Sequence, residues 1–275
     1  MKLQELITSG KMWVAEPSDE DTPQTAPAVA SSIPRRRLIE SCAEQYRYVQ
    51  KLESLPLGIQ EIDDLLPHGG LPFGHTHEWC AVDSDGKNYP PLTIIAAMLG
   101  RAYNNPLNRE RYVLWLGEKL WPTPYLLSQC GGDLLIEQSR FISLSKKDTR
   151  AWALVQSLSS SAVLAVVGAV QDIPLSYSKK LAYAAARGST LGIFIKDHEG
   201  ISKPSASLTK WCVTSQITSP HEEVSSWSLS LLHHKGSSLN KKNWTITASH
   251  GTAYETISLA LSPHMVNGYR RAASL

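Results

Sequence analysis

The sequence has few cysteines and no excess of either charge. Its 275 residues include four cysteines, none in C-x-x-C spacing, and this usage favours reduced thiols in a cytoplasmic protein. Lys and Arg number 27 against 25 Asp and Glu, so the chain carries no global electrostatic signal for nucleic acid or for an anionic membrane. Any contact with DNA must therefore be local.

Long apolar runs are also lacking. No segment approaches the roughly 18 apolar residues that suggest a membrane span, and the first residues do not combine a charged region with a long apolar core as a signal peptide does. We therefore expect neither secretion nor a membrane partner. The hydrophobic content of 42% is ordinary for a chain of this length that folds around one main core.

Composition shifts divide the chain into four parts. Residues 1–14 carry an apolar stripe that predicts a short amphipathic helix, and residues 15–34 are a linker rich in Pro, Ser, Thr and acidic residues. Residues 35–262 form the main domain, and residues 263–275 form a tail. Both ends of the chain are candidate partner-binding segments, through Leu3, Leu6, Ile7, Trp13, Arg270 and Arg271. The alternative is that both segments pack back onto the domain.

The main domain alternates between short apolar runs and helical patterns. The runs typical of buried parallel strands cover residues 77–82, 112–116, 141–144, 163–167 and 192–195. Helical periodicity between them covers residues 92–103, 124–130, 149–158 and 176–187. Antiparallel strands are expected at the end of the domain, over residues 207–214, 227–233 and 244–248. The pattern predicts an α/β fold with a mostly parallel central sheet, flanking helices and antiparallel strands at the C-terminal edge.

Eight tryptophans are spread along the chain. Trp115, Trp121 and Trp152 fall in or beside predicted strands and helices, so we expect them to pack in the core. Trp13 and Trp79 are candidate anchors in a partner interface, where aromatic side chains dominate the binding energy.

A glycine-rich turn precedes the first predicted strand of the sheet. Gly69, Gly70 and Gly74 lie in the segment GGLPFG, and tight turns need positive φ or a close approach of the backbone. The pair Gly86 and Lys87 follows at a fixed offset. This arrangement resembles the RecA family, in which a turn of the form G-G-x-P-x-G leads into the strand before the phosphate-binding loop. The resemblance implies a RecA-like P-loop NTPase core.

The phosphate-binding loop departs from the working pattern. In G-x-x-x-x-G-K-[ST], backbone N–H groups and Lys hold phosphates, and the hydroxyl ligates Mg²⁺. Aligned by the resemblance, Ala81 replaces the first glycine and Asn88 replaces the hydroxyl residue, while Gly86 and Lys87 remain. Two aspartates inside the loop would repel a polyphosphate, and two prolines occupy what should be the first helical turn. We therefore expect no bound ATP and no other cofactor.

Two positions outside the loop bear on catalysis. Gly168 stands where the resemblance places the Asp that orients Mg²⁺ in an ATPase. Glu118 matches the glutamate with which RecA-like ATPases polarise water, and the alternative is a surface carboxylate in a loop. We interpret these two residues and the four of the loop as a vestigial nucleotide-binding site, and the chain as a protein without enzyme activity.

Further stretches are similar to the ImuA family, RecA-related proteins of bacterial mutagenesis cassettes. The similarity rests on LPLGIQEIDDLLPHGGLPFGHTHEW, YVLWLGEKLWPTPYLLSQCGGD and LSLLHHKGSSLNKKNWTIT. It implies a noncatalytic accessory protein of SOS-induced translesion DNA synthesis and DNA repair. Its implied partners are an ImuB-like Y-family polymerase relative and an error-prone polymerase alpha subunit, with RecA and DNA as further candidates. Two alternatives stay open, a RecA-class DNA-dependent ATPase and a SulA-like cell-division inhibitor.

The sequence also contains one local cluster of basic side chains and one group of histidines. Lys235, Lys241 and Lys242 form a basic cluster that is a candidate DNA contact, and the alternative is a solvated turn. Three histidines lie between residues 68 and 77, but no cysteine or carboxylate pair stands near them at ligand spacing. The sequence therefore predicts no metal site.

Overall fold

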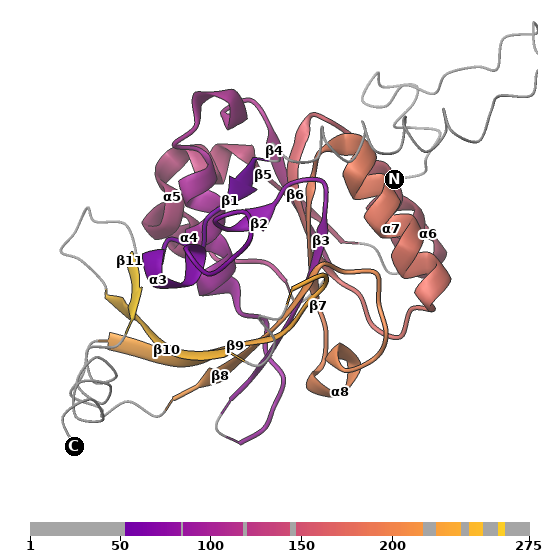
Figure 1. Cartoon of the computed structure of the whole chain (residues 1–275). Helices are drawn as coiled ribbons and strands as arrows, with labels where there is room; N and C mark the ends of the chain where they lie inside the picture. Colours follow the sequence, from indigo (N-terminus) through magenta and orange to yellow (C-terminus); the bar gives the residue numbers. More distant parts are fainter. Residues whose placement is uncertain are drawn as a thin grey trace, which may run out of the picture. The chain divides into compact units, whose positions relative to one another are not determined.

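The computed structural model of the chain describes residues 53–83, 85–117, 120–143, 147–216, 224–237, 242–249 and 258–261. The predicted boundaries after residues 14, 34 and 262 lie outside these ranges. The described part contains a nine-stranded sheet with helices on both faces (Figure 1). A separate two-stranded sheet consists of β1 (Ser54–Leu55) and β2 (Leu71–Pro72).

The nine strands of the large sheet lie in the order β11-β10-β9-β8-β3-β7-β6-β4-β5. Their bounds are β3 (Thr76–Val82), β4 (Tyr112–Leu116), β5 (Ser139–Ile142), β6 (Val163–Ala169), β7 (Leu191–Ile195), β8 (Thr209–Ser215), β9 (Val224–His234), β10 (Lys242–Ser249) and β11 (Ser258–Leu261). Neighbours from β8 through β3 to β5 are parallel, and neighbours from β8 to β11 are antiparallel. The predicted mixed α/β fold, with a mostly parallel sheet and antiparallel strands at its C-terminal edge, is confirmed.

The strand expected over residues 207–214 has a different role from the one predicted. β8 pairs in parallel with β3 on one side and antiparallel with β9 on the other. It therefore belongs to the parallel core as well as to the antiparallel edge. The reason is topological, because the connection through the short helix α8 (His198–Ile201) carries the chain from β7 across β3 and returns it in the same direction.

Two pairs of helices cover the two faces of the sheet. α4 (Leu92–Ala102) packs beside α5 (Pro124–Gln138), and α6 (Lys147–Leu158) packs beside α7 (Leu175–Gly188) (Figure 1). Shorter elements are α3 (Gln60–Asp63) and the 3-10 turn η2 (Pro106–Asn108). Among the described residues, no helix has the length and apolar character that crossing a bilayer requires.

Two hydrophobic clusters lie on opposite faces of the sheet. Trp115 belongs to the cluster under α4 and α5, whereas the next residue, Leu116, belongs to the cluster under α6 and α7. This division follows from strand geometry, because successive side chains of a strand point to opposite faces. Strands buried on both faces are apolar at nearly every position, and this explains why the sequence pattern located them.

The tryptophans match the sequence expectation only in part. Trp115 is fully buried, as predicted, but Trp121 and Trp152 expose 47% and 64% of their surface. Trp152 is exposed because the inward stripe of α6 runs through Leu154 and Leu158 instead. Trp79 is fully buried and stacks on Trp211 with ring centroids 5.3 Å apart, so it is not an interface anchor.

The predicted turn glycines all have positive φ, with +67° at Gly69, +153° at Gly70 and +75° at Gly74. At Gly70 the constraint is also steric, because a Cβ there would lie 2.4 Å from the carbonyl oxygen of Leu55. The Gly74 N–H donates to the Thr190 carbonyl at 3.1 Å, just before β3 begins. The turn therefore positions the start of the central strand β3 beside the residue that precedes β7.

Candidate functional site

The strand, loop and helix that contain the predicted nucleotide site lie at the centre of the sheet. β3 lies between β7 and β8, and the chain then passes through residues 83–91 into α4. In open α/β sheets ligands bind at the carboxyl ends of such strands. The loop therefore stands where a phosphate site would be expected.

The loop is closed by the side chain of Asp83. Its Oδ1 accepts the backbone N–H of Lys87 at 2.7 Å and that of Asp85 at 3.0 Å. The Gly86 N–H donates to the Asp83 carbonyl at 3.0 Å, and the Asp83 N–H donates to the Lys87 carbonyl at 2.9 Å. In a phosphate-binding loop such amides point at the phosphates. Here three consecutive amides, those of Asp85, Gly86 and Lys87, donate to Asp83, two to its carboxylate and one to its backbone carbonyl.

The other predicted loop residues do not converge on a common point. Ala81 is buried within β3, and its carbonyl accepts the Tyr89 N–H at 3.0 Å. The Lys87 ammonium is largely exposed and lies 3.7 Å from the carboxylate of Asp85, which is also exposed. The side chain of Asn88 accepts the backbone N–H of His198 at 2.9 Å. Asn88 therefore ties the loop to the start of α8.

The two prolines after the loop lie before α4 and not within its first turn. The helix begins at Leu92, and Pro91 is its N-cap with φ −78° and ψ 57°. The helical pattern of the sequence also begins at residue 92, and the two prolines precede the helix because a proline disfavours the helical conformation in the residue before it. The Leu92 N–H donates to the Pro90 carbonyl at 2.8 Å, so this amide also has a partner within the segment.

Gly168 lies inside β6 and not beyond its end. The strand continues to Ala169, two residues further than predicted, and Gly168 pairs with Leu116 and Phe194. A Cβ at Gly168 would approach the side chain of Leu154 on α6 to 3.0 Å, so the position is set by packing. The first carboxylate after β6 is Asp172, which is ion-paired with Lys203. Glu118 lies outside the described residues.

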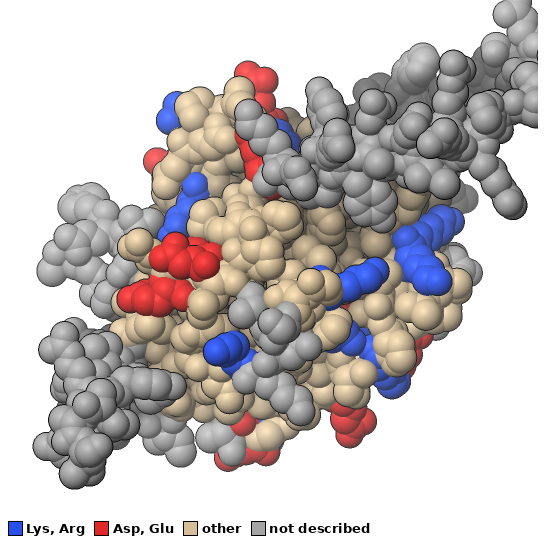
Figure 2. All heavy atoms as spheres, in the orientation of Figure 1, with Lys and Arg blue, Asp and Glu red and all other residues tan. Residues whose placement is uncertain are grey.

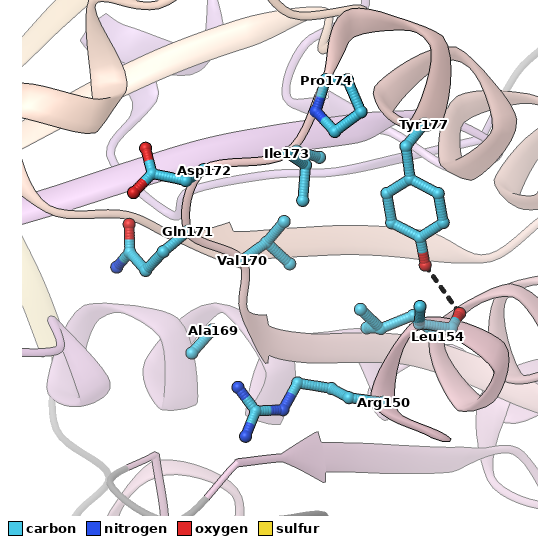
Figure 3. Close-up of a pocket in the computed structure, with 10 residues that line it drawn as sticks. Arg150, Leu154, Ala169, Val170, Gln171, Asp172, Ile173, Pro174 and Tyr177 are labelled. Atoms are coloured by element: carbon cyan, nitrogen blue, oxygen red, sulfur yellow. Dashed lines mark hydrogen bonds between the residues drawn. The ribbon is translucent and has the colours of Figure 1, made fainter. Parts of the chain in front are cut away.

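A cavity of about 540 Å³ opens beside the end of β6, between α6 and α7 (Figure 3). Its walls are mainly apolar, and Arg150, Gln171 and Asp172 add polar groups. The Tyr177 hydroxyl donates to the Ala151 carbonyl at 2.6 Å, and burial raises the Tyr177 pKa. The volume falls within the range of small-molecule sites. Sequence reasoning missed this cavity because its residues come from two helices and a loop that carry no motif.

A buried group of three charges lies at the centre of the sheet. The Glu78 carboxylate of β3 is 3.0 Å from the Lys196 ammonium and 3.6 Å from the Lys210 ammonium. Ser205 donates to the same carboxylate at 2.9 Å. Burial lowers the Lys210 pKa, although the Glu78 charge opposes this effect. The sequence signal was a single glutamate inside an apolar strand. Its partners were not apparent because Lys210 lies on the neighbouring strand β8 and Lys196 directly follows the other neighbour, β7.

The basic cluster predicted near the end of the chain is only partly described. Lys235 follows β9 and Lys242 begins β10, and both residues are exposed. Lys241 lies outside the described residues, as do all the predicted partner-binding residues: Leu3, Leu6, Ile7, Trp13, Arg270 and Arg271. Figure 2 shows basic side chains over the α6 and α7 side of one face and acidic ones over the α3 side. This distribution agrees with the balanced composition of the chain.

The chain matches no protein-family model and no curated protein.

Proposed function

We propose that this chain is a noncatalytic RecA-like accessory protein of SOS-induced translesion DNA synthesis and DNA repair, similar to the ImuA family. In this role it binds an ImuB-like Y-family polymerase relative and an error-prone polymerase alpha subunit. The arrangement of β3, residues 83–91 and α4 as strand, loop and helix supports a RecA-like core, since P-loops occur in that context. The observation that carries the noncatalytic assignment is the loop closure by Asp83.

The closure works against nucleotide binding in two ways. A phosphate would have to displace the Asp83 carboxylate from the amides of Asp85 and Lys87, and hydrogen bonds to a charged group contribute about 1.5–3 kcal/mol each. The displaced carboxylate would then lie beside the phosphate and repel it. Lys87 remains as the one cation that the motif retains, and in this structure it is directed to Asp85.

The first test is a calorimetric titration of the full chain with Mg-ATP. We expect no binding in the micromolar range, and we expect Lys87→Ala to leave the titration unchanged. Asp83→Gly, which removes the closing carboxylate, serves as the comparison variant. A low micromolar Kd for the unmodified chain that is abolished by Lys87→Ala would overturn the noncatalytic assignment and favour the RecA-class ATPase.

The second test measures association with a purified ImuB-like polymerase relative. We expect deletion of residues 1–16 or of residues 263–275 to weaken binding at least tenfold, because apolar and aromatic anchors such as Trp13 dominate helix-in-groove contacts. Trp152→Ser, at an exposed position on α6, is the control for a contact through the body of the domain. If neither deletion weakens the complex, the terminal segments are not the interface. Binding to the division protein instead of the polymerase relative would favour the SulA-like alternative.

A further inference from the structure

Three metal-ligating side chains from separate parts of the sequence meet beneath the loop after β3. Cys80 on β3 and Cys212 on β8 are directly paired in the parallel register. His198 is the first residue of α8, and its Nδ1 lies 4.0 Å from the Cys80 Sγ and 3.9 Å from the Cys212 Sγ. All three donor atoms lie within 4.8 Å of one another.

The surroundings differ on the two sides of this cluster. Cys80 and Cys212 are buried free thiols packed with Ile201 and Leu232, whereas His198 is exposed. The thiols lie on the face of the sheet opposite the stacked Trp79 and Trp211, because neighbouring residues of a strand point in opposite directions. The cluster is therefore apolar behind the sulfur atoms and open to solvent at the imidazole.

We propose that Cys80, Cys212 and His198 form a binding site for Zn²⁺, with a water molecule as the fourth ligand. Two sulfurs and an imidazole nitrogen select soft or borderline cations and not Mg²⁺ or Ca²⁺, which prefer oxygen. With Zn–S bonds of about 2.3 Å and Zn–N bonds of about 2.0–2.1 Å, the corners of a tetrahedral site lie about 3.5–3.8 Å apart. A sulfur–nitrogen edge lies at the lower end of this range, about 3.5–3.6 Å. The distances of 4.0 and 3.9 Å exceed it by roughly 0.3–0.5 Å, and small side-chain movements would complete the geometry.

Charge and local hydrogen bonding support the same assignment. Two buried thiolates without a cation would be costly, but with Zn²⁺ they form a neutral unit. The backbone of His198 is already held by the side chain of Asn88, and this contact fixes the third ligand near the thiols.

The site would join the central strand to the antiparallel edge and to α8. It involves none of the amides closed by Asp83, so it stands independently of the proposed function. A metal that binds the folded chain and not the unfolded chain stabilises the fold. The Asn88 contact also means that the bound metal would restrain the loop from the side of α8.

Cobalt substitution tests the site directly on the full chain, purified under reducing conditions. We expect one Co²⁺ per chain, with thiolate-to-cobalt charge transfer and the strong visible bands of tetrahedral coordination, and displacement of Co²⁺ by Zn²⁺ but not by Mg²⁺. Cys80→Ser, Cys212→Ser and His198→Ala should each weaken Zn²⁺ binding by more than the roughly 10–100-fold that follows loss of an outer-shell partner. Cys130→Ser, at another buried free thiol, and His233→Ala, at an exposed histidine, should leave it unchanged.

Two outcomes would overturn the site. One is an absence of stoichiometric Co²⁺ and Zn²⁺ uptake, including the case in which peptide mapping finds a Cys80–Cys212 disulfide in the reduced preparation. The other is a cobalt spectrum that survives in Cys212→Ser. If a cysteine variant fails to fold, the exposed His198→Ala variant decides, because its side chain supports no core packing.

Discussion

Replacing Glu78 with glutamine is expected to lower the free energy of unfolding by about 3–5 kcal/mol, the loss typical of removing one partner from a buried ion pair. The Glu78 side chain is 1% exposed and faces two ammonium groups, Lys196 and Lys210. Glutamine keeps the shape and removes the only negative charge of the group. Chemical denaturation at neutral pH measures the loss.

The stability loss of Glu78→Gln can be compared with the losses caused by substitutions at neighbouring and at exposed charged residues. Lys196→Met should cost less than Glu78→Gln, because Glu78 keeps Lys210 and Ser205 as partners. The double variant should be more stable than the sum of the two single losses predicts, since both changes disrupt one interaction. Glu110→Gln, at an exposed glutamate, should change stability by no more than about 0.5 kcal/mol. A loss for Glu78→Gln as small as that of Glu110→Gln would contradict a charged, buried group.

Acidification from pH 7 to pH 4 is expected to destabilise the fold through His77. This residue is fully buried, and burial lowers its pKa from the ordinary 6.5 to about 3. The folded chain therefore keeps His77 neutral in a range where the unfolded chain protonates it. Stability is complete above about pH 6.5 and falls by about 1.4 kcal/mol per pH unit as the pH decreases toward 3. The loss from this residue is about 3–4 kcal/mol at pH 4 and reaches about 4–5 kcal/mol only near pH 3.

Hydrogen bonding explains why the neutral imidazole is preferred. The His77 Nε2 faces the Pro72 carbonyl at 3.3 Å, an arrangement that assigns the proton to Nε2. Its Nδ1 then accepts from the Thr209 hydroxyl at 2.8 Å, and this hydroxyl oxygen accepts the Trp211 indole N–H at 2.8 Å. Protonation of Nδ1 would take away the acceptor of the Thr209 hydroxyl proton and would bury a charge.

Denaturation curves at several pH values measure the effect, and His77→Gln separates it from general acid unfolding. This variant should be less stable at pH 7 but should lose less stability between pH 6.5 and pH 4. Burial also lowers the pKa of His75 and His234, so a smaller slope of the same sign remains in the variant. His233→Gln, at an exposed histidine, should keep the original slope. An unchanged slope in His77→Gln would show that His77 is not the group responsible.

Local sequence patterns predicted many of the helices and strands. The strand predicted over residues 112–116 matches β4, and the helix predicted from residue 92 begins at the first residue of α4. Such elements are recognisable because strands buried on both faces are apolar throughout, and amphipathic helices repeat their apolar residues every three to four positions. The helix predicted to end at residue 130 instead continues to Gln138, across a kink at Gly132 with φ +63°. A glycine in the sequence predicts such a break, but it does not indicate whether the helix resumes after it.

By itself the sequence determined the class of the sheet and the order of its main elements along the chain. Only the tertiary structure decided how the strands are ordered, because local periodicity contains no information on which strands become neighbours. That order places Lys196 and Lys210 on either side of Glu78, and it pairs Cys80 with Cys212 beside His198. The closure of the loop after β3 also depends on the tertiary structure, because the sequence does not show the backbone course that brings the Asp83 carboxylate onto the amides of Asp85 and Lys87.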